Sequence, residues 1–175
     1  MVTPATDSAS TDAVAIVTGG SCAIGREIAV KLARRGYAVV VVYLGHQGAA
    51  EAAVDEILAA GGTAVAVRAD IADELDVERL FTETAAAFGG ADVVVHSAMR
   101  TTSVVNQQAA RRLRHGGAII DLSSSEAITP GLADELRARD IMVNGVGPGL
   151  EPPGAQRDVA DLLVLLDPWR RSPGT

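Results

Sequence analysis

The feature that most constrains this chain is a regular alternation between short apolar runs, rich in valine and alanine, and longer segments with helical spacing. The apolar runs predict strands at 14–17, 39–43, 64–67, 92–96, 118–122 and 142–146. The other segments predict helices at 26–35, 49–60, 73–88, 103–114, 132–139 and 157–166, with Asp73 and Ser103 as caps. Such alternation is typical of a doubly wound parallel sheet, so the predicted fold class is α/β with about six strands.

Composition agrees with one buried sheet. Of the 175 residues, 48% are hydrophobic and only 3% are aromatic, so the core must be built from Val, Ala, Leu and Ile. The helix at 49–60 is expected to face this core through Ala53, Val54, Ile57 and Leu58. We expect a single Rossmann-like domain over 13–175, preceded at 1–12 by a disordered tail rich in Ser, Thr and Asp.

Charge and cysteine content exclude several kinds of partner. The net charge of −7 argues against a nucleic-acid surface, because phosphate binding needs a concentrated basic field. Arginine groups at 111–114, 137–139 and 170–171 are interpreted as helix faces in solvent. The single Cys22 excludes an internal disulfide and a cysteine metal cluster, and it fits a reducing cytoplasm. No apolar run is long enough to span a membrane, so we expect a soluble, cytoplasmic protein with no membrane partner.

A glycine-containing loop, TGGSCAIGR at 18–26, stands between the first strand and the first helix. In this context Gly19 permits a tight turn, and Gly25 lets the helix pack close to the strand. Backbone N–H groups at the start of such a helix can bind a pyrophosphate. Ala23 occupies the place of the usual middle glycine. The alternative interpretation is a strand-turn-helix connection with a structural role only.

The loop, Asp70 after the third strand, and the segments 92–98, 119–124 and 141–149 together resemble the short-chain dehydrogenase/reductase family. The resemblance implies a Rossmann-like fold, an NAD(P) cofactor and oxidoreductase chemistry on a small-molecule ligand. The implied cofactor-binding residues are Thr18, Gly19, Ser21, Cys22, Ile24, Gly25, Tyr43, Asp70, Ile71, Ser97, Ala98, Pro148 and Gly149.

The chain departs from the family where the family carries its catalytic Tyr-x-x-x-Lys. No tyrosine occurs between Ser123 and Thr175, and Lys31 is the only lysine. The segments 98–117 and 124–132 are shorter than in the family, and no substrate-binding lid or seventh strand is recognisable after Gly149. The two shortened segments belong to the helices that precede and follow the fifth strand, and in the family these helices form the main dimer interface. A homo-oligomer of this chain is therefore expected to have an altered interface.

Two residues remain as catalytic candidates. Ser124 aligns with the family's serine that orients the substrate carbonyl, and ordinary turn chemistry in a run of three serines is the alternative. His96 ends the fourth strand beside the fifth, which places a base near that hydroxyl. The alternative for His96 is a hydrogen bond within the sheet. Cys22, close to a helix N-terminus, is either a reactive thiol or a passive loop residue.

The choice of cofactor depends on the end of the second strand, where Tyr43 and Leu44 stand. The lack of an acidic residue there favours NADP over NAD, while the lack of an arginine weakens the case for NADP. Arg26 or His46 can supply positive charge, and Asp70 with Ile71 matches the family's adenine-contacting pair. Loss of cofactor binding altogether also remains open.

Three functions are consistent with these residues. The first is an NAD(P)-linked oxidoreductase homologue with impaired or non-standard chemistry, because the usual proton donor is missing. The second is a module that binds a nucleotide or a partner without turnover. The third is a non-redox enzyme, such as a cyclase or dehydratase, that uses the opened cleft.

Overall fold

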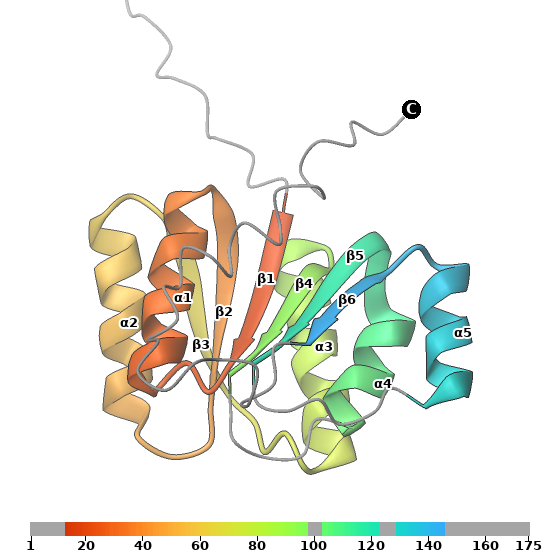
Figure 1. The fold of residues 1–175 in the computed structure, drawn as a ribbon. Helices are drawn as coiled ribbons and strands as arrows, with labels where there is room; N and C mark the ends of the chain where they lie inside the picture. The colour runs from red at the N-terminus through yellow and green to blue at the C-terminus, as the bar shows by residue number, and fades with distance from the viewer. Residues whose placement is uncertain (1–12, 98–102, 123–128, 146–175) are drawn as a thin grey trace, which may run out of the picture.

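The strands of the described chain form one parallel sheet in the order β3-β2-β1-β4-β5-β6 (Figure 1). The computed structural model describes residues 13–97, 103–122 and 129–145, so the expected tail at 1–12 and helix at 157–166 lie outside it. The strands are β1 (Ala13–Thr18), β2 (Tyr37–Tyr43), β3 (Thr63–Arg68), β4 (Ala91–His96), β5 (Leu113–Asp121) and β6 (Met142–Gly145). The helices are α1 (Ala23–Arg34), α2 (Gln47–Ala59), α3 (Glu74–Phe88), α4 (Ser103–Arg112) and α5 (Pro130–Ala138).

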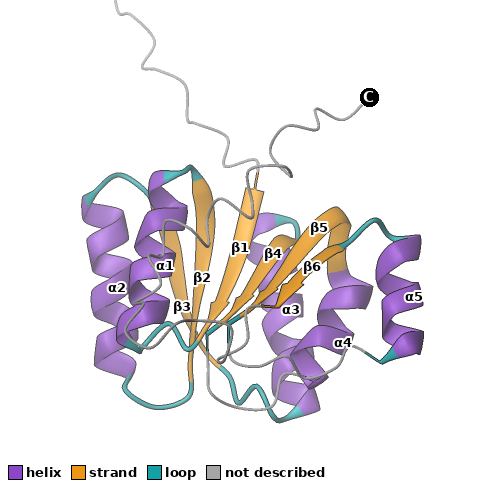
Figure 2. Cartoon of the chain, in the orientation of Figure 1, coloured by secondary structure: helices purple, strands orange, loops and turns teal. Residues whose placement is uncertain are grey.

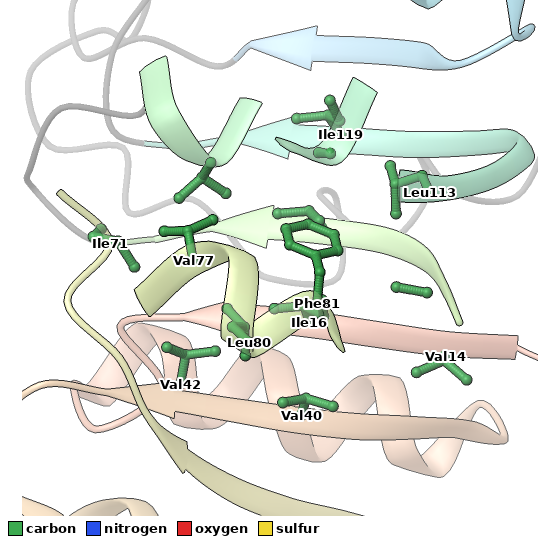
Figure 3. Close-up of a cluster of buried hydrophobic side chains, with 14 of the residues drawn as sticks. Val14, Ile16, Val40, Val42, Ile71, Val77, Leu80, Phe81, Leu113 and Ile119 are labelled. Atoms are coloured by element: carbon green, nitrogen blue, oxygen red, sulfur yellow. The ribbon is translucent and has the colours of Figure 1, made fainter. Parts of the chain in front are cut away.

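Helices cover both faces of this sheet (Figure 2). One face packs against α1 and α2, and its core includes Val17, Ile28 and Ile57. The other face packs against α3, α4 and α5, and its core includes Ile16, Phe81 and Leu136. Figure 3 shows Ile16 and Phe81 within this core. Since alternate residues of a strand point to opposite faces, continuous valine runs such as 39–42 fill both cores at once. The doubly wound α/β fold is confirmed.

Helix ends follow local hydrogen bonds. Asp73 caps α3 as predicted, because its Oδ1 accepts from the backbone N–H of Asp76 at 2.9 Å. The first helix begins at Ala23, three residues before the predicted start, because Cys22 already acts as its N-cap. In α2 the prediction for Leu58 was wrong: Ala53 and Ile57 are buried, but Leu58 is 50% exposed on the adjacent, outward position.

The segment at 113–117 was predicted as helix end and loop, but it belongs to β5. Helix α4 ends at Arg112, and Ser103 is its first residue instead of its cap. The reason is a tertiary contact: the Arg114 guanidinium donates to Asp92 Oδ2 at 2.7 Å and to the Phe88 carbonyl at 3.0 Å. These bonds hold the start of β5 against β4, where the pairing register shifts.

Candidate functional site

The candidate site lies at the carboxyl edge of the sheet, where the strand order reverses between β1 and β4. The helix that follows β1, α1, covers one face of the sheet, and the helix that follows β4, α4, covers the other (Figure 1). In open α/β sheets, ligands bind in the crevice at such a switch point. Thr18, Tyr43, Arg68 and His96 end the four strands around it.

The glycine loop is a compact turn that delivers the chain into α1. Gly19 has φ 69°, and its carbonyl accepts from Cys22 N–H at 3.0 Å. Cys22 Sγ in turn accepts from Gly25 N–H at 3.4 Å, which gives the thiol a capping role. A Cβ on Gly25 would lie 2.8 Å from the Gly19 carbonyl carbon and closer still to its oxygen. Only glycine fits there, as the sequence predicted.

The first turn of α1 offers donors to an anion. Among the described residues, none accepts a hydrogen bond from the backbone N–H of Ala23 or Ile24. No acidic residue stands in this turn, so the positive end of the helix dipole is not neutralised locally. This donor set fits a phosphate or pyrophosphate group.

Ser97 joins the loop to β4. Its hydroxyl donates to the Thr18 carbonyl at 2.6 Å, and its oxygen lies 4.0 Å from Cys22 Sγ. A Cβ on Gly25 would also lie 2.9 Å from that hydroxyl oxygen. The structure therefore brings four predicted site residues, Thr18, Cys22, Gly25 and Ser97, into one cluster.

His96 is fully buried at the carboxyl end of β4, a central strand of the sheet. Its Nδ1 lies 2.7 Å from Thr18 Oγ1, and its register partners are Thr18 on β1 and Asp121 on β5. Partners in a parallel register point to the same face, so these three polar residues form a row across neighbouring strands. This contact matches the sheet-bonding interpretation of His96. The serine it was expected to serve, Ser124, lies outside the described residues.

The connection from β3 to α3 carries Asp70 and Ile71. Asp70 Oδ1 accepts from Ala72 N–H at 3.0 Å, and the Ile71 side chain is buried in the core with 6% exposure. Ala69 N–H donates to the Tyr43 carbonyl at 2.9 Å, which ties the connection to the end of β2. The connection that carries Asp70 is thus tied to the end of β2, where Tyr43 was predicted to bind the cofactor.

Two residues that the sequence interpretation missed fix this connection from α3. Asp76 Oδ2 accepts from Asp70 N–H at 2.8 Å, and Arg79 donates to Asp76 Oδ1 at 2.9 Å and to the Arg68 carbonyl at 3.0 Å. The Asp70 N–H, and after it Arg79, lower the pKa of Asp76 below its usual value. A helical Asp-x-x-Arg pair was the only sequence signal, and it is also typical of exposed helix surfaces.

The cations considered for a 2′-phosphate differ in availability. Arg26 donates to Glu56 of α2 through Nε at 3.1 Å and Nη2 at 2.8 Å, so it already has a carboxylate partner. His46 is exposed and stands at the N-cap position of α2 with a φ of 55°. Tyr37 starts β2 at the other end of the strands from the site, and Lys31 pairs with Glu27 on α1 at 2.8 Å.

Several predicted positions cannot be placed in the site. Ala98, Ser124, Pro148 and Gly149 lie outside the described residues. Within the described part of the chain, none of the helices is both long and apolar enough to cross a membrane.

Comparison with known proteins gives consistent matches. Residues 13–113 match the family model for short chain dehydrogenase. An uncharacterized oxidoreductase of Methylorubrum extorquens is 35% identical over 178 residues, covering 78% of this chain and 72% of that protein. A hydroxynaphthalene reductase-like protein of Metarhizium majus is 32% identical, covering 85% and 70%.

Solved structures agree with these sequence matches. A dehydrogenase/reductase from Sinorhizobium meliloti superposes with a TM-score of 0.64 at 34% identity, covering 78% of this chain and 71% of that one. A short chain dehydrogenase from Burkholderia cenocepacia in complex with NADP gives a TM-score of 0.67 at 29% identity, covering 87% and 89%.

Proposed function

Because this chain belongs to the short-chain dehydrogenase/reductase family, we propose that it binds a nicotinamide adenine dinucleotide, with NADP favoured over NAD, at the carboxyl edge of its sheet. The observation that carries the proposal is the pair of backbone donors, Ala23 and Ile24 N–H, at the start of α1. The NADP complex of a structural relative supports the choice of a nicotinamide dinucleotide as ligand.

Each part of the dinucleotide would meet a different group. The two α1 donors would bind the pyrophosphate, with Thr18, Gly19 and Gly25 shaping the loop around it. Asp70 and Ile71 would contact the adenine, because Asp70 Oδ2 and the Ile71 N–H have no partner among the described residues. The rest of the dinucleotide, its riboses and its nicotinamide, would be contacted by Ser21, Cys22, Tyr43, Ser97, Ala98, Pro148 and Gly149.

The nicotinamide ring, when bound, supplies or accepts a hydride. This chain would hold a substrate carbonyl through the Ser124 hydroxyl, but it has no tyrosine or lysine between Ser124 and Asn144. The proton would then come from water or from a hydroxyl of the ligand. His96 is a poor donor, because it is buried and its Nδ1 contacts Thr18. Loss of a positioned general acid lowers a rate by about 10²–10⁴-fold, so slow turnover is expected.

A nucleotide-binding module without turnover is the second candidate. The missing Tyr-x-x-x-Lys favours it, since the binding groups described above do not depend on that motif. A non-redox enzyme of the cyclase or dehydratase kind has no specific contact in its favour.

A titration with NADPH and then NADH, followed by calorimetry and nicotinamide fluorescence, tests the proposal. Saturable binding supports a dinucleotide site, and a lower dissociation constant for NADPH supports the cofactor preference. A screen of carbonyl substrates then separates the candidates, because an oxidoreductase consumes nicotinamide absorbance while a binding module does not. Lack of binding of both cofactors would contradict the proposal and direct attention to a non-redox ligand.

A further inference from the structure

The first two turns of α3 hold the connection that follows β3 from one side. Asp76 accepts from Asp70 N–H at 2.8 Å, and Arg79 donates to the Arg68 carbonyl at 3.0 Å. The two side chains also bond to each other at 2.9 Å. A single ion pair therefore binds the backbone at Arg68 and at Asp70, the two ends of a three-residue span.

This span fixes the orientation of two hydrogen-bonding groups. Ile71 is anchored next to it in the same core cluster as Val77 of α3 (Figure 3). Asp70 Oδ1 is used by Ala72 N–H, which leaves Oδ2 as an acceptor and the Ile71 N–H as a donor. An acceptor beside a donor matches the amino group and ring nitrogen of adenine. Hypoxanthine has an oxygen and a ring N–H at these positions, so it offers the reverse pattern.

We propose that Asp76 and Arg79 are positioning residues that give the site its preference for adenine over hypoxanthine. They act through the backbone of Asp70 and do not touch the ligand themselves. The inference rests on the proposed dinucleotide site, and it adds the two residues that hold the adenine-contacting groups in place.

The charges of the pair are suited to this role. The Asp70 N–H and Arg79 lower the pKa of Asp76, and the hydrogen bond to Asp76 raises the pKa of Arg79, so both stay ionised at neutral pH. The charges of Arg79 and Arg68 also favour the ionised form of Asp76. Without Arg79, Asp76 would lose its side-chain partner.

The test compares two ligands across a set of variants. The ligands are NADPH and its analogue with hypoxanthine in place of adenine, titrated by calorimetry. Asp76→Ala removes the acceptor for Asp70 N–H, whereas Asp76→Asn keeps an amide oxygen at that place. The matched control is Asp134→Ala on α5, since Asp134 forms the same i,i+3 pair with Arg137 at 2.9 Å but lies on another helix.

We expect Asp76→Ala to weaken NADPH binding by about tenfold, the scale of one hydrogen bond to a charged group, and to leave the analogue almost unchanged. The ratio of the two dissociation constants should then approach one, while Asp76→Asn and Asp134→Ala keep the wild-type ratio. Circular dichroism verifies that each variant is folded.

Other outcomes refute the inference in distinguishable ways. If Asp76→Ala weakens both ligands equally, or neither, the pair is only structural and the dinucleotide site stands. If the ratio of the two dissociation constants also approaches one in Asp134→Ala, the effect is not specific to the Asp76–Arg79 pair. Failure of both ligands to bind the wild type would overturn the proposed function and, with it, the inference.

Discussion

Replacing Gly25 by alanine tests the close contact on which the glycine loop depends. The added Cβ would lie 2.8 Å from the Gly19 carbonyl carbon and 2.9 Å from Ser97 Oγ, and real Cβ atoms essentially never approach other atoms to less than 3.0 Å. Backbone atoms of Gly19 cannot rotate away as a flexible side chain can. The loop must therefore move relative to α1, or the helix must move away from β1.

The expected cost follows from these contacts. Overpacking costs about 1–3 kcal/mol, and the upper part of this range applies because backbone atoms are crowded. Alanine regains up to about 1 kcal/mol of helix propensity, which leaves a net loss of about 2 kcal/mol. For a chain of this size, that loss corresponds to a fall in Tm of about 4–8 °C. The same displacement moves the Ala23 and Ile24 donors, so NADPH affinity should fall as well.

Gly48→Ala is the matched control, because Gly48 also lies in the first turn of a helix but has no atom within 4 Å of an added Cβ. This variant should be as stable as the wild type or more stable by up to about 1 kcal/mol, with unchanged NADPH binding. Thermal unfolding followed by circular dichroism measures both variants. A Gly25→Ala protein with the Tm and NADPH affinity of the wild type would refute the close-packing argument.

Two further predictions concern carboxylates. Asp92→Ala should lower the free energy of unfolding by about 1.5–3 kcal/mol, because Asp92 is buried and accepts from Val14 N–H and from Arg114, both at 2.7 Å. Urea unfolding measures the loss, and the exposed Asp134→Ala should change little. The second prediction is a pH dependence of stability. Since the folded-state pKa of Asp76 is lowered from 3.8, its contribution is present above that value and is lost as the pH falls through the folded pKa. The stability difference between wild type and Asp76→Asn should therefore shrink between about pH 6 and about pH 3 in urea titrations, and a constant difference would contradict this assignment.

The strands could be predicted from the sequence because each contains a local apolar run, which is almost wholly buried in β1, β2 and β4. The early start of β5 could not, because it depends on the pairing of Arg114 with Asp92, 22 residues away in sequence. The turn of the glycine loop was predictable from its spacing, since the contacts among Gly19, Cys22 and Gly25 are local, but its contact with Ser97 was not. Arg26 is a candidate for cofactor charge, and its ion pair with Glu56 could not be predicted, because a contact between two helices leaves no pattern in the sequence.

The described residues of the site separate into two groups with different physical roles. Gly25, Ser97 and the Thr18–His96 pair join β1, β4 and α1 to one another, so the fold itself requires them whether or not a ligand binds. The Ala23 and Ile24 N–H groups and Asp70 Oδ2 serve no contact among the described residues, so they are available to water or to a ligand. Retention of the glycine loop is therefore weak support for cofactor binding, because packing alone explains it. The two α1 donors and the proposed adenine-contacting groups of Asp70 and Ile71 are the better place to test binding, because the packing of the described residues does not use them.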